Sequence, residues 1–224
     1  MLSKKVSLGA AEFASPADAA WSQAKSQKVD LMPVPVAMQP SIYITSTMGN
    51  RPIGKVKQVK VSSLHNGSEI AIRMEWADPD RNLERVDSNI FPDGCALMFP
   101  MGDDAPIVTM GSEEQPVNLW HWRADRSDRA HSNLAGGLGT TDVTDRNTIK
   151  TVANYLSGHW SVVFQRPLST AAQGALASDA AGKMKQFAAG GKTKLACAVW
   201  EGGNGERGGL KAFSPAWVEL ELEQ

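Results

Sequence analysis

The chain has 224 residues, with 23 lysines and arginines against 24 aspartates and glutamates. This length suits one large domain or two small ones and is enough to bury a hydrophobic core. The near balance of charge argues against nucleic acid as a partner. The longest apolar runs, such as residues 195–200, are far shorter than the roughly 18 residues that a membrane-spanning helix needs, so we expect no membrane span.

The first thirty residues are rich in Ala and Ser and show little periodicity. They predict an N-terminal arm with one short helical turn near residues 17–24, ahead of one domain over residues 31–224. Two lysines precede a weak apolar patch that Glu12 interrupts, which is not the pattern of a signal peptide. Alone, this favours the cytoplasm, although a chain exported together with a signal-bearing partner looks the same.

From residue 31 onward, short extended segments follow one another, most of them bounded by Gly, Pro, Asn or Asp. Residues 31–40 carry several prolines and suit an edge segment. Asn66 and Gly67 predict a tight hairpin turn between two strands, because this pair accepts positive φ angles. The segments that we expect to be strands are 41–47, 56–65, 68–78, 94–100, 105–111, 117–124, 159–168, 193–203 and 214–223.

Only two stretches are candidates for helices. Residues 142–156 offer Thr144 or Asp145 as a cap but contain several β-branched residues, and residues 181–191 form a short helix closed by Gly. About ten strands, short turns and few helices predict a mainly all-β fold. We expect an antiparallel β-sandwich of about ten strands with a few short helices.

Standard catalytic motifs are missing from the sequence. It contains no nucleophile elbow, P-loop or dinucleotide fingerprint, and we interpret its Gly-rich stretches, 136–140 and 202–209, as surface loops. The four histidines show no metal-binding spacing, and there is no CxxCH motif for covalently attached haem. Cys95 and Cys197 suit buried strand positions, and a disulfide between neighbouring strands remains open.

Methionine and tryptophan are the unusual residues, with nine and seven copies. Core packing explains most of them. Met110 differs because it ends a predicted strand directly before Gly111, where the missing Cβ lets another group approach closely. Trp120 and Trp122 share one face of the next predicted strand, and His121 lies on the other face.

At this point the chain resembles a known family, the γ subunits of ethylbenzene dehydrogenase and its relatives. These relatives are the haem b subunits of dimethyl sulfide dehydrogenase, selenate reductase, chlorate reductase and steroid C25 dehydrogenase. The resemblance follows the family's order over most of the chain after residue 40. Its segments are 63–78, 93–100, 108–125, 149–168 and 194–217.

The resemblance implies a β-sandwich that holds one non-covalent haem b, with a Met sulfur and a Lys amine on the iron. The family's Met-Gly motif falls on Met110, and its Lys falls on Lys150. Met101 also precedes a Gly and is the rival sulfur ligand. Two protein ligands leave no open coordination position, which suits electron transfer rather than catalysis.

For the rest of the pocket, we expect Trp120 and Trp122 to provide a flat apolar wall. Asn118 and His65 are weaker candidates for contact with the cofactor. Arg166 is a candidate partner for a haem propionate, with a surface salt bridge as the alternative.

The resemblance also implies partners and a location. The chain would be a non-catalytic electron-transfer subunit beside a molybdopterin-containing α subunit and an iron–sulfur β subunit, passing electrons to a soluble cytochrome or other acceptor. The complex would hydroxylate a hydrocarbon or sterol side chain and work in the periplasm, which this chain would reach by co-export. The alternative is a cofactor-free β-sandwich that binds a ligand or carbohydrate through exposed Trp residues. A mononuclear metal hydrolase is disfavoured, because no His and carboxylate ligands cluster.

Overall fold

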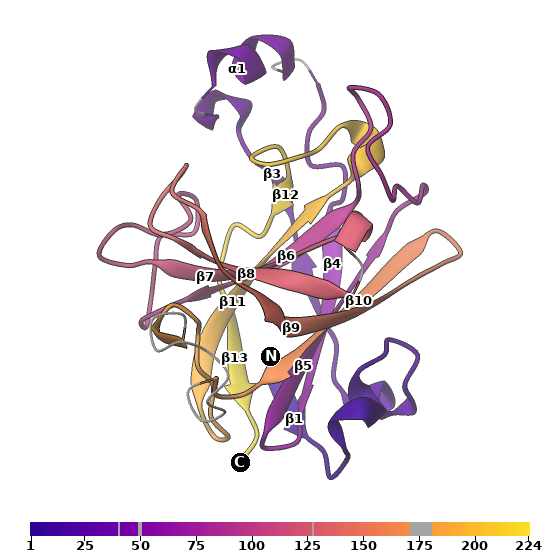
Figure 1. The fold of residues 1–224 in the computed structure, drawn as a ribbon, viewed down its shortest axis with the longest axis vertical. Coiled ribbons are helices and arrows are strands. Elements are labelled where there is room, and N and C mark those ends of the chain that lie inside the picture. Colours follow the sequence, from indigo (N-terminus) through magenta and orange to yellow (C-terminus); the bar gives the residue numbers. More distant parts are fainter. Residues whose placement is uncertain (40, 49–50, 127, 171–180) are drawn as a thin grey trace.

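The computed structural model describes residues 1–39, 41–48, 51–126, 128–170 and 181–224. Its strands form one sheet that closes on itself (Figure 1). Ten strands make the ring in the order β13-β1-β4-β5-β10-β9-β8-β7-β6-β11, and β11 pairs back to β13. All pairs in the ring are antiparallel except those of β1, which runs parallel to both β4 and β13.

The elements have the following bounds. The strands are β1 (Leu2–Lys5), β2 (Gln27–Asp30), β3 (Met32–Pro33), β4 (Gln58–His65), β5 (Glu69–Ala77), β6 (Gly94–Pro100), β7 (Val117–Arg123), β8 (Arg129–Ala135), β9 (Asp142–Leu156), β10 (His159–Pro167), β11 (Lys192–Trp200), β12 (Ala212–Phe213) and β13 (Val218–Leu222). The helices are α1 (Ile42–Met48) and the 3-10 turns η1 (Ala10–Phe13), η2 (Ala19–Gln23), η3 (Val36–Met38), η4 (Ala124–Arg126) and η6 (Gly202–Asn204).

Aromatic side chains fill the space between the two halves of the ring. The ring of Trp122 on β7 lies 5.2 Å from that of Trp160 on β10 and 6.5 Å from that of Trp76 on β5, measured between centroids. Trp120 reaches Phe164 on β10 in the same way, at 6.4 Å. These contacts hold opposite strands face to face, and the predicted mainly antiparallel β-sandwich is confirmed.

The N-terminal residues belong to the sheet and do not form a separate arm. β1 pairs with β4 and β13 and so closes the ring. Phe13 and Trp21 are buried and form a second small core with Leu64 and Val163. Trp21 belongs to η2, which falls where the sequence predicted a helical turn.

The hairpin between β4 and β5 is confirmed. The side-chain oxygen of Asn66 accepts hydrogen bonds from the backbone N–H groups of Ser68 and Glu69, and Gly67 has φ +90°. Cys95 and Cys197 are buried, as expected, and the disulfide that the sequence left open is not formed between them.

Four segments differ from the prediction. Residues 42–48 are helical because they lie outside the sheet, where their β-branched side chains have no strand to pair with. Residues 142–156 form β9, because pairing with both β8 and β10 outweighs a local cap. Residues 105–111 form turns, and of residues 181–191 only the first two are helical. Within the described residues, no helix is long and apolar enough to cross a membrane.

Candidate functional site

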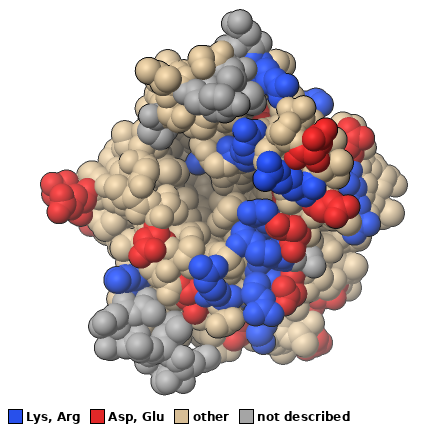
Figure 2. Space-filling view, turned by 45° about the horizontal axis from the view of Figure 1, so that its top comes forward, with Lys and Arg blue, Asp and Glu red and all other residues tan. Residues whose placement is uncertain are grey.

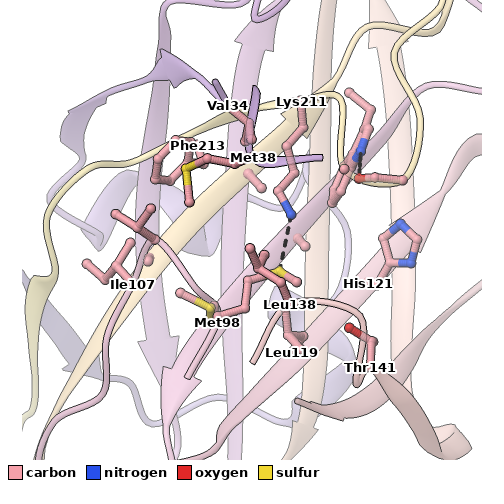
Figure 3. A pocket seen from close by; sticks show the side chains of 18 of the residues that line it. Val34, Met38, Met98, Ile107, Leu119, His121, Leu138, Thr141, Lys211 and Phe213 are labelled. Atoms are coloured by element: carbon pink, nitrogen blue, oxygen red, sulfur yellow. Dashed lines mark hydrogen bonds between the residues drawn. The ribbon is translucent and has the colours of Figure 1, made fainter. Parts of the chain in front are cut away.

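A cavity of about 420 Å³ lies on the outer face of β6, β7 and β11 (Figure 3). Its floor is the sheet, and its walls are segments from four distant parts of the chain. The lining residues in these parts of the chain are Val34, Met38, Gln39 and Ile44, then Ile107, Val108 and Met110, then Leu138, Gly139 and Thr141, and finally Gly208, Gly209, Lys211, Phe213 and Ser214. This volume lies in the range of small-molecule and cofactor sites.

Small side chains create the recess. Ala96 on β6 and Ala198 on β11 are direct partners in the sheet, and Ala196 lies opposite Met98. All four side chains line the cavity. Three alanines in neighbouring positions leave a shallow apolar floor that larger side chains would fill.

Met110 reaches this cavity from the loop between β6 and β7. Its backbone has φ +57°, an uncommon conformation for a residue with a side chain. The following Gly111 has φ +84°, and an added Cβ there would come within 2.8 Å of the Gln115 carbonyl oxygen. Hydrogen bonds from Met110 N–H to Ile107 and from Gly111 N–H to Pro106 hold the turn. The surrounding structure therefore fixes Met110 in a strained position, which is common at functional sites.

Lys211 approaches Met110 from another wall. Its Nζ lies 3.3 Å from the Met110 Sδ and donates a hydrogen bond to it, drawn as the dashed line in Figure 3. The same ammonium lies 5.2 Å from the ring centre of Trp200. Burial in this apolar setting lowers the pKa of Lys211 to about 8. Two electron-pair donors, a thioether and an amine that is easy to neutralise, thus meet in one cavity.

His121 on β7 lines the same cavity, and its ring lies 5.0 Å from that of Trp200. Burial, and next the positive charge of Arg126, lower the pKa of His121 to about 3. The imidazole is therefore neutral at physiological pH and adds no charge to the cavity.

Three predicted pocket residues on β7 face away from the cavity. Trp120, Trp122 and Asn118 are fully buried in the core between the halves of the ring. Asn118 donates hydrogen bonds to the Ser132 side chain and the Asn133 carbonyl. Strand alternation is the reason: residues 119 and 121 point into the cavity, so 118, 120 and 122 point into the core. The two indoles therefore do not line this cavity.

His65 and Arg166 also lie away from the cavity. His65 ends β4, fully buried, and this burial lowers its pKa. Arg166 on β10 is buried in the core, where it donates hydrogen bonds to the Pro167 and Lys185 carbonyls. Neither side chain lines the cavity.

The predicted lysine ligand is also not brought to Met110. Lys150 is exposed on β9 and does not line the cavity. Met101 follows β6 and is likewise not a lining residue; its carbonyl accepts a hydrogen bond from Lys185. The structure instead pairs Met110 with Lys211, which lies in the resembling segment 194–217. The overlooked signal was a lysine set between the two buried residues Leu210 and Ala212.

The described residues contain no group of three or more His, Cys, Asp or Glu side chains placed to hold a metal ion. The donors that meet in the cavity are instead the sulfur of Met110 and the amine of Lys211, in an apolar setting.

Comparison with known proteins bears on this arrangement. The family described as ethylbenzene dehydrogenase matches residues 18–147 and 135–212. This chain belongs to that family. The match covers the Met110 loop, the cavity floor and Lys211, and thus most of the residues that line the cavity.

Three relatives are similar in sequence to this chain. A protein of Haloferax mediterranei assigned as a respiratory nitrate reductase heme subunit, ORF7, is 32% identical over 81% of this chain, which spans 62% of that relative. The chlorate reductase γ subunit of Ideonella dechloratans is 29% identical over 96% of this chain and 82% of its own length. The dimethylsulfide dehydrogenase γ subunit of Rhodovulum sulfidophilum is 27% identical, and the match covers 91% of this chain and 73% of that subunit.

Solved structures show a shared fold at low sequence identity. A family 9 carbohydrate-binding module from Caldicellulosiruptor kristjanssonii, in complex with glucose, is 12% identical with a TM-score of 0.53, and the match covers 100% of this chain and 95% of the module. A protein of Bacteroides uniformis assigned as carbohydrate-binding is 12% identical with a TM-score of 0.55. The match covers 100% of this chain and 98% of that protein. At this identity the similarity concerns the fold alone.

Proposed function

We propose that the chain is an electron-transfer subunit that binds one non-covalent haem b in the cavity, with Met110 and Lys211 as axial ligands. The observation that carries the proposal is the 3.3 Å contact between the sulfur of Met110 and the amine of Lys211 inside an apolar recess. A bound haem with both axial positions taken would exchange electrons without binding substrate.

The names of the relatives support this proposal. One is assigned as a heme subunit, and two are γ subunits of oxidoreductases. We also propose a molybdopterin-containing α subunit and an iron–sulfur β subunit as partners of the chain. The electrons would pass on to a soluble cytochrome or another acceptor. We further propose that the complex works in the periplasm, with hydrocarbon or sterol oxidation as its reaction class.

The chemistry of the two side chains fits a haem iron. A thioether favours ferrous iron and raises the reduction potential. A lysine binds iron only when neutral. At pH 7, removing its proton costs about 5 kcal/mol from the ordinary pKa of 10.5, but about 1.4 kcal/mol from a pKa of about 8. Burial of Lys211 therefore removes most of the cost of deprotonation before any ligand binds.

The shape of the cavity fits as well. The alanine floor and the apolar walls suit a flat apolar ring. Met110 and Lys211 must move apart to admit an iron atom, which their unbranched, flexible side chains allow.

The alternative, carbohydrate binding, receives less support. Sugar recognition by stacking needs exposed aromatic faces. Six of the seven tryptophans are buried, and the seventh, Trp217, is half-buried and donates its ring N–H to the Ala105 carbonyl. The cavity lining is mainly apolar and has few polar groups to bind sugar hydroxyls.

Absorbance spectroscopy tests the ligand assignment. The chain reconstituted with haem b should show a sharp low-spin Soret band that shifts on reduction with dithionite. Met110→Ala and Lys211→Ala should each give a high-spin spectrum or no bound haem. Met101→Ala and Lys150→Ala are matched controls and should keep the low-spin band.

Two outcomes contradict the proposal in different ways. A chain that stays colourless with haem present has no haem function. A low-spin band that survives Lys211→Ala but is lost in Lys150→Ala restores the lysine that the resemblance indicated.

A further inference from the structure

The charges of Arg126, Lys211 and Arg123 all act on His121 at one end of the cavity, although neither Arg126 nor Arg146 lines the cavity itself. His131 on β8 lies directly opposite His121 in the sheet. Two guanidinium groups approach its ring: Nη1 of Arg126 lies 2.7 Å from Nδ1, and Nη1 of Arg146 lies 3.3 Å from the same atom. We refer to Arg126 and Arg146 as the arginine pair. Figure 2 shows Lys and Arg side chains in a band beside a hollow of the surface.

The charge of the arginine pair is poorly balanced. The carboxylate of Asp125 is 4.0 Å from Arg126 but bonds Arg123 much more closely, at 2.6 Å. In the described part of the chain, Arg146 has no carboxylate within 4.0 Å. Burial, and next the charges of Arg126 and Arg146, lower the pKa of His131, and an imidazole ring carries no negative charge that could balance the two arginines. Asp125, at 4.0 Å and shared with Arg123, and the nearby charge of Asp145 balance the two guanidinium groups only in part, which favours an anion as a third partner.

The position of the pair suggests which anion. Asn133, two residues beyond His131 on β8, lines the cavity, as does His121 on the neighbouring strand. The cavity itself is apolar, so a ligand with a flat apolar body and charged carboxylates would place the body inside and the carboxylates at a cationic edge.

We propose that Arg126 and Arg146 bind the propionate carboxylates of the haem, an inference that rests on the proposed function. Arginine suits this role because its planar fork can bind a carboxylate with two parallel hydrogen bonds. Arg166, the residue that the sequence indicated, is buried in the core with its N–H groups bonded to two carbonyls. It does not line the cavity, and its Nη2 has no hydrogen-bond partner among the described residues.

Binding of two porphyrins tests the inference without any activity assay. Haem b and its dimethyl ester share the iron and the ring, but the ester carries no carboxylate charge. The wild-type chain should bind haem b about tenfold to a hundredfold more tightly than the ester in absorbance titrations, the loss expected for charged hydrogen bonds.

The double variant Arg126→Gln/Arg146→Gln should bind haem b about as weakly as wild type binds the ester. It should also bind the two porphyrins with similar affinity. Arg129→Gln is the matched control, since Arg129 is an exposed arginine of β8 already paired with Asp128 at 2.6 Å. It should keep the preference for haem b.

Three results overturn the inference, and they are distinguishable. Equal binding of both porphyrins by wild type means that the carboxylates make no such contact, while the low-spin band leaves the proposed function standing. An unchanged preference in the double variant assigns the carboxylates to other residues and leaves the arginine pair as a surface for an acidic protein. No binding of either porphyrin removes the proposed function and this inference together.

Discussion

At the scale of single residues, the cavity holds groups that cost stability. Lys211 lies in an apolar recess, and among the described residues no carboxylate lies within ion-pair distance of it. Met110 adopts a left-handed backbone conformation that is unfavourable for a residue with a Cβ. Both features make sense if the two side chains are held for a ligand, because structure around functional sites often tolerates such costs.

Substitution of Lys211→Met should stabilise the protein without haem. The pKa of Lys211 is about 8 when folded and 10.5 ordinarily, so folding disfavours the ammonium form. This penalty is complete below pH 8 and disappears as the pH rises through 10.5. The ammonium borders an open cavity, so we expect a gain of about 1 to 2 kcal/mol at pH 7 and almost none near pH 10.5.

Urea denaturation of both proteins at the two pH values measures this difference. Lys150→Met, at an exposed site, should change stability by less than about 0.5 kcal/mol. A stability loss in Lys211→Met that is equal at both pH values would show that the ammonium is not penalised in the fold.

The turn after Met110 gives a second prediction. Gly111→Ala should destabilise the chain by roughly 3 kcal/mol, because it combines a positive φ with a 2.8 Å approach to the Gln115 carbonyl. Gly139→Ala separates the two effects, since Gly139 has φ +83° but open space around the new Cβ. It should cost about 1 kcal/mol. Equal losses in thermal or urea unfolding would mean that the close approach is unimportant.

At the scale of elements, strand alternation decides which side chains can meet a ligand. On β7 the large aromatics of residues 120 and 122 pack between the halves of the ring, while residues 119 and 121 face outward. On β6 and β11 the outward positions include Ala96, Ala196 and Ala198, beside Met98 and Trp200. The loops then rise above this floor and supply Met110 and Lys211. The strands thus provide shape, and the loops provide the donor atoms.

Filling the floor should separate folding from binding. Ala198→Leu places a larger apolar side chain into the cavity from β11, where there is room for it. We expect a stability change within about 1 kcal/mol, because no packed core is disturbed. Haem binding, followed by the Soret band, should be lost. Retention of full affinity would place the macrocycle elsewhere on the molecule.

At the scale of the whole molecule, closure of the sheet depends on the N-terminus. β1 is the strand that joins β13 to β4, and η1 behind it carries the buried Phe13. A closed ring leaves few unpaired edges, which protects the strands from pairing with other chains.

Phe13→Ala tests whether the first thirty residues are part of the fold. The side chain is fully buried, so its loss should cost about 3 to 5 kcal/mol in urea denaturation. Lys4→Ala, at an exposed position of β1, is the control and should change stability by less than about 0.5 kcal/mol. A negligible loss for Phe13→Ala would agree with the free arm that the sequence predicted.

Local patterns predicted local features well. The Asn66–Gly67 turn, the alternating strands on either side of it and the mainly antiparallel class were all readable, because turn chemistry and period-two patterning act over a few residues. Residues 41–47 and 142–156 were not, since their β-branched residues suit a strand or a poor helix equally until a pairing partner is known. The sequence did not predict the N-terminal strand β1 for the same reason, because both of its partner strands lie far away in sequence.

The sequence by itself indicated the fold class, the family resemblance and Met110 as the sulfur donor that we propose, with Met101 as its rival, because these rest on contiguous motifs. Only the tertiary structure decided which lysine faces Met110 and which face of β7 is free. Lys211 is separated from Met110 by 101 positions. Their meeting depends on the closed ring, which brings the loop after β6 and the loop after β11 over one alanine floor. Contacts of that span come from the packing of whole strands, which no local pattern encodes.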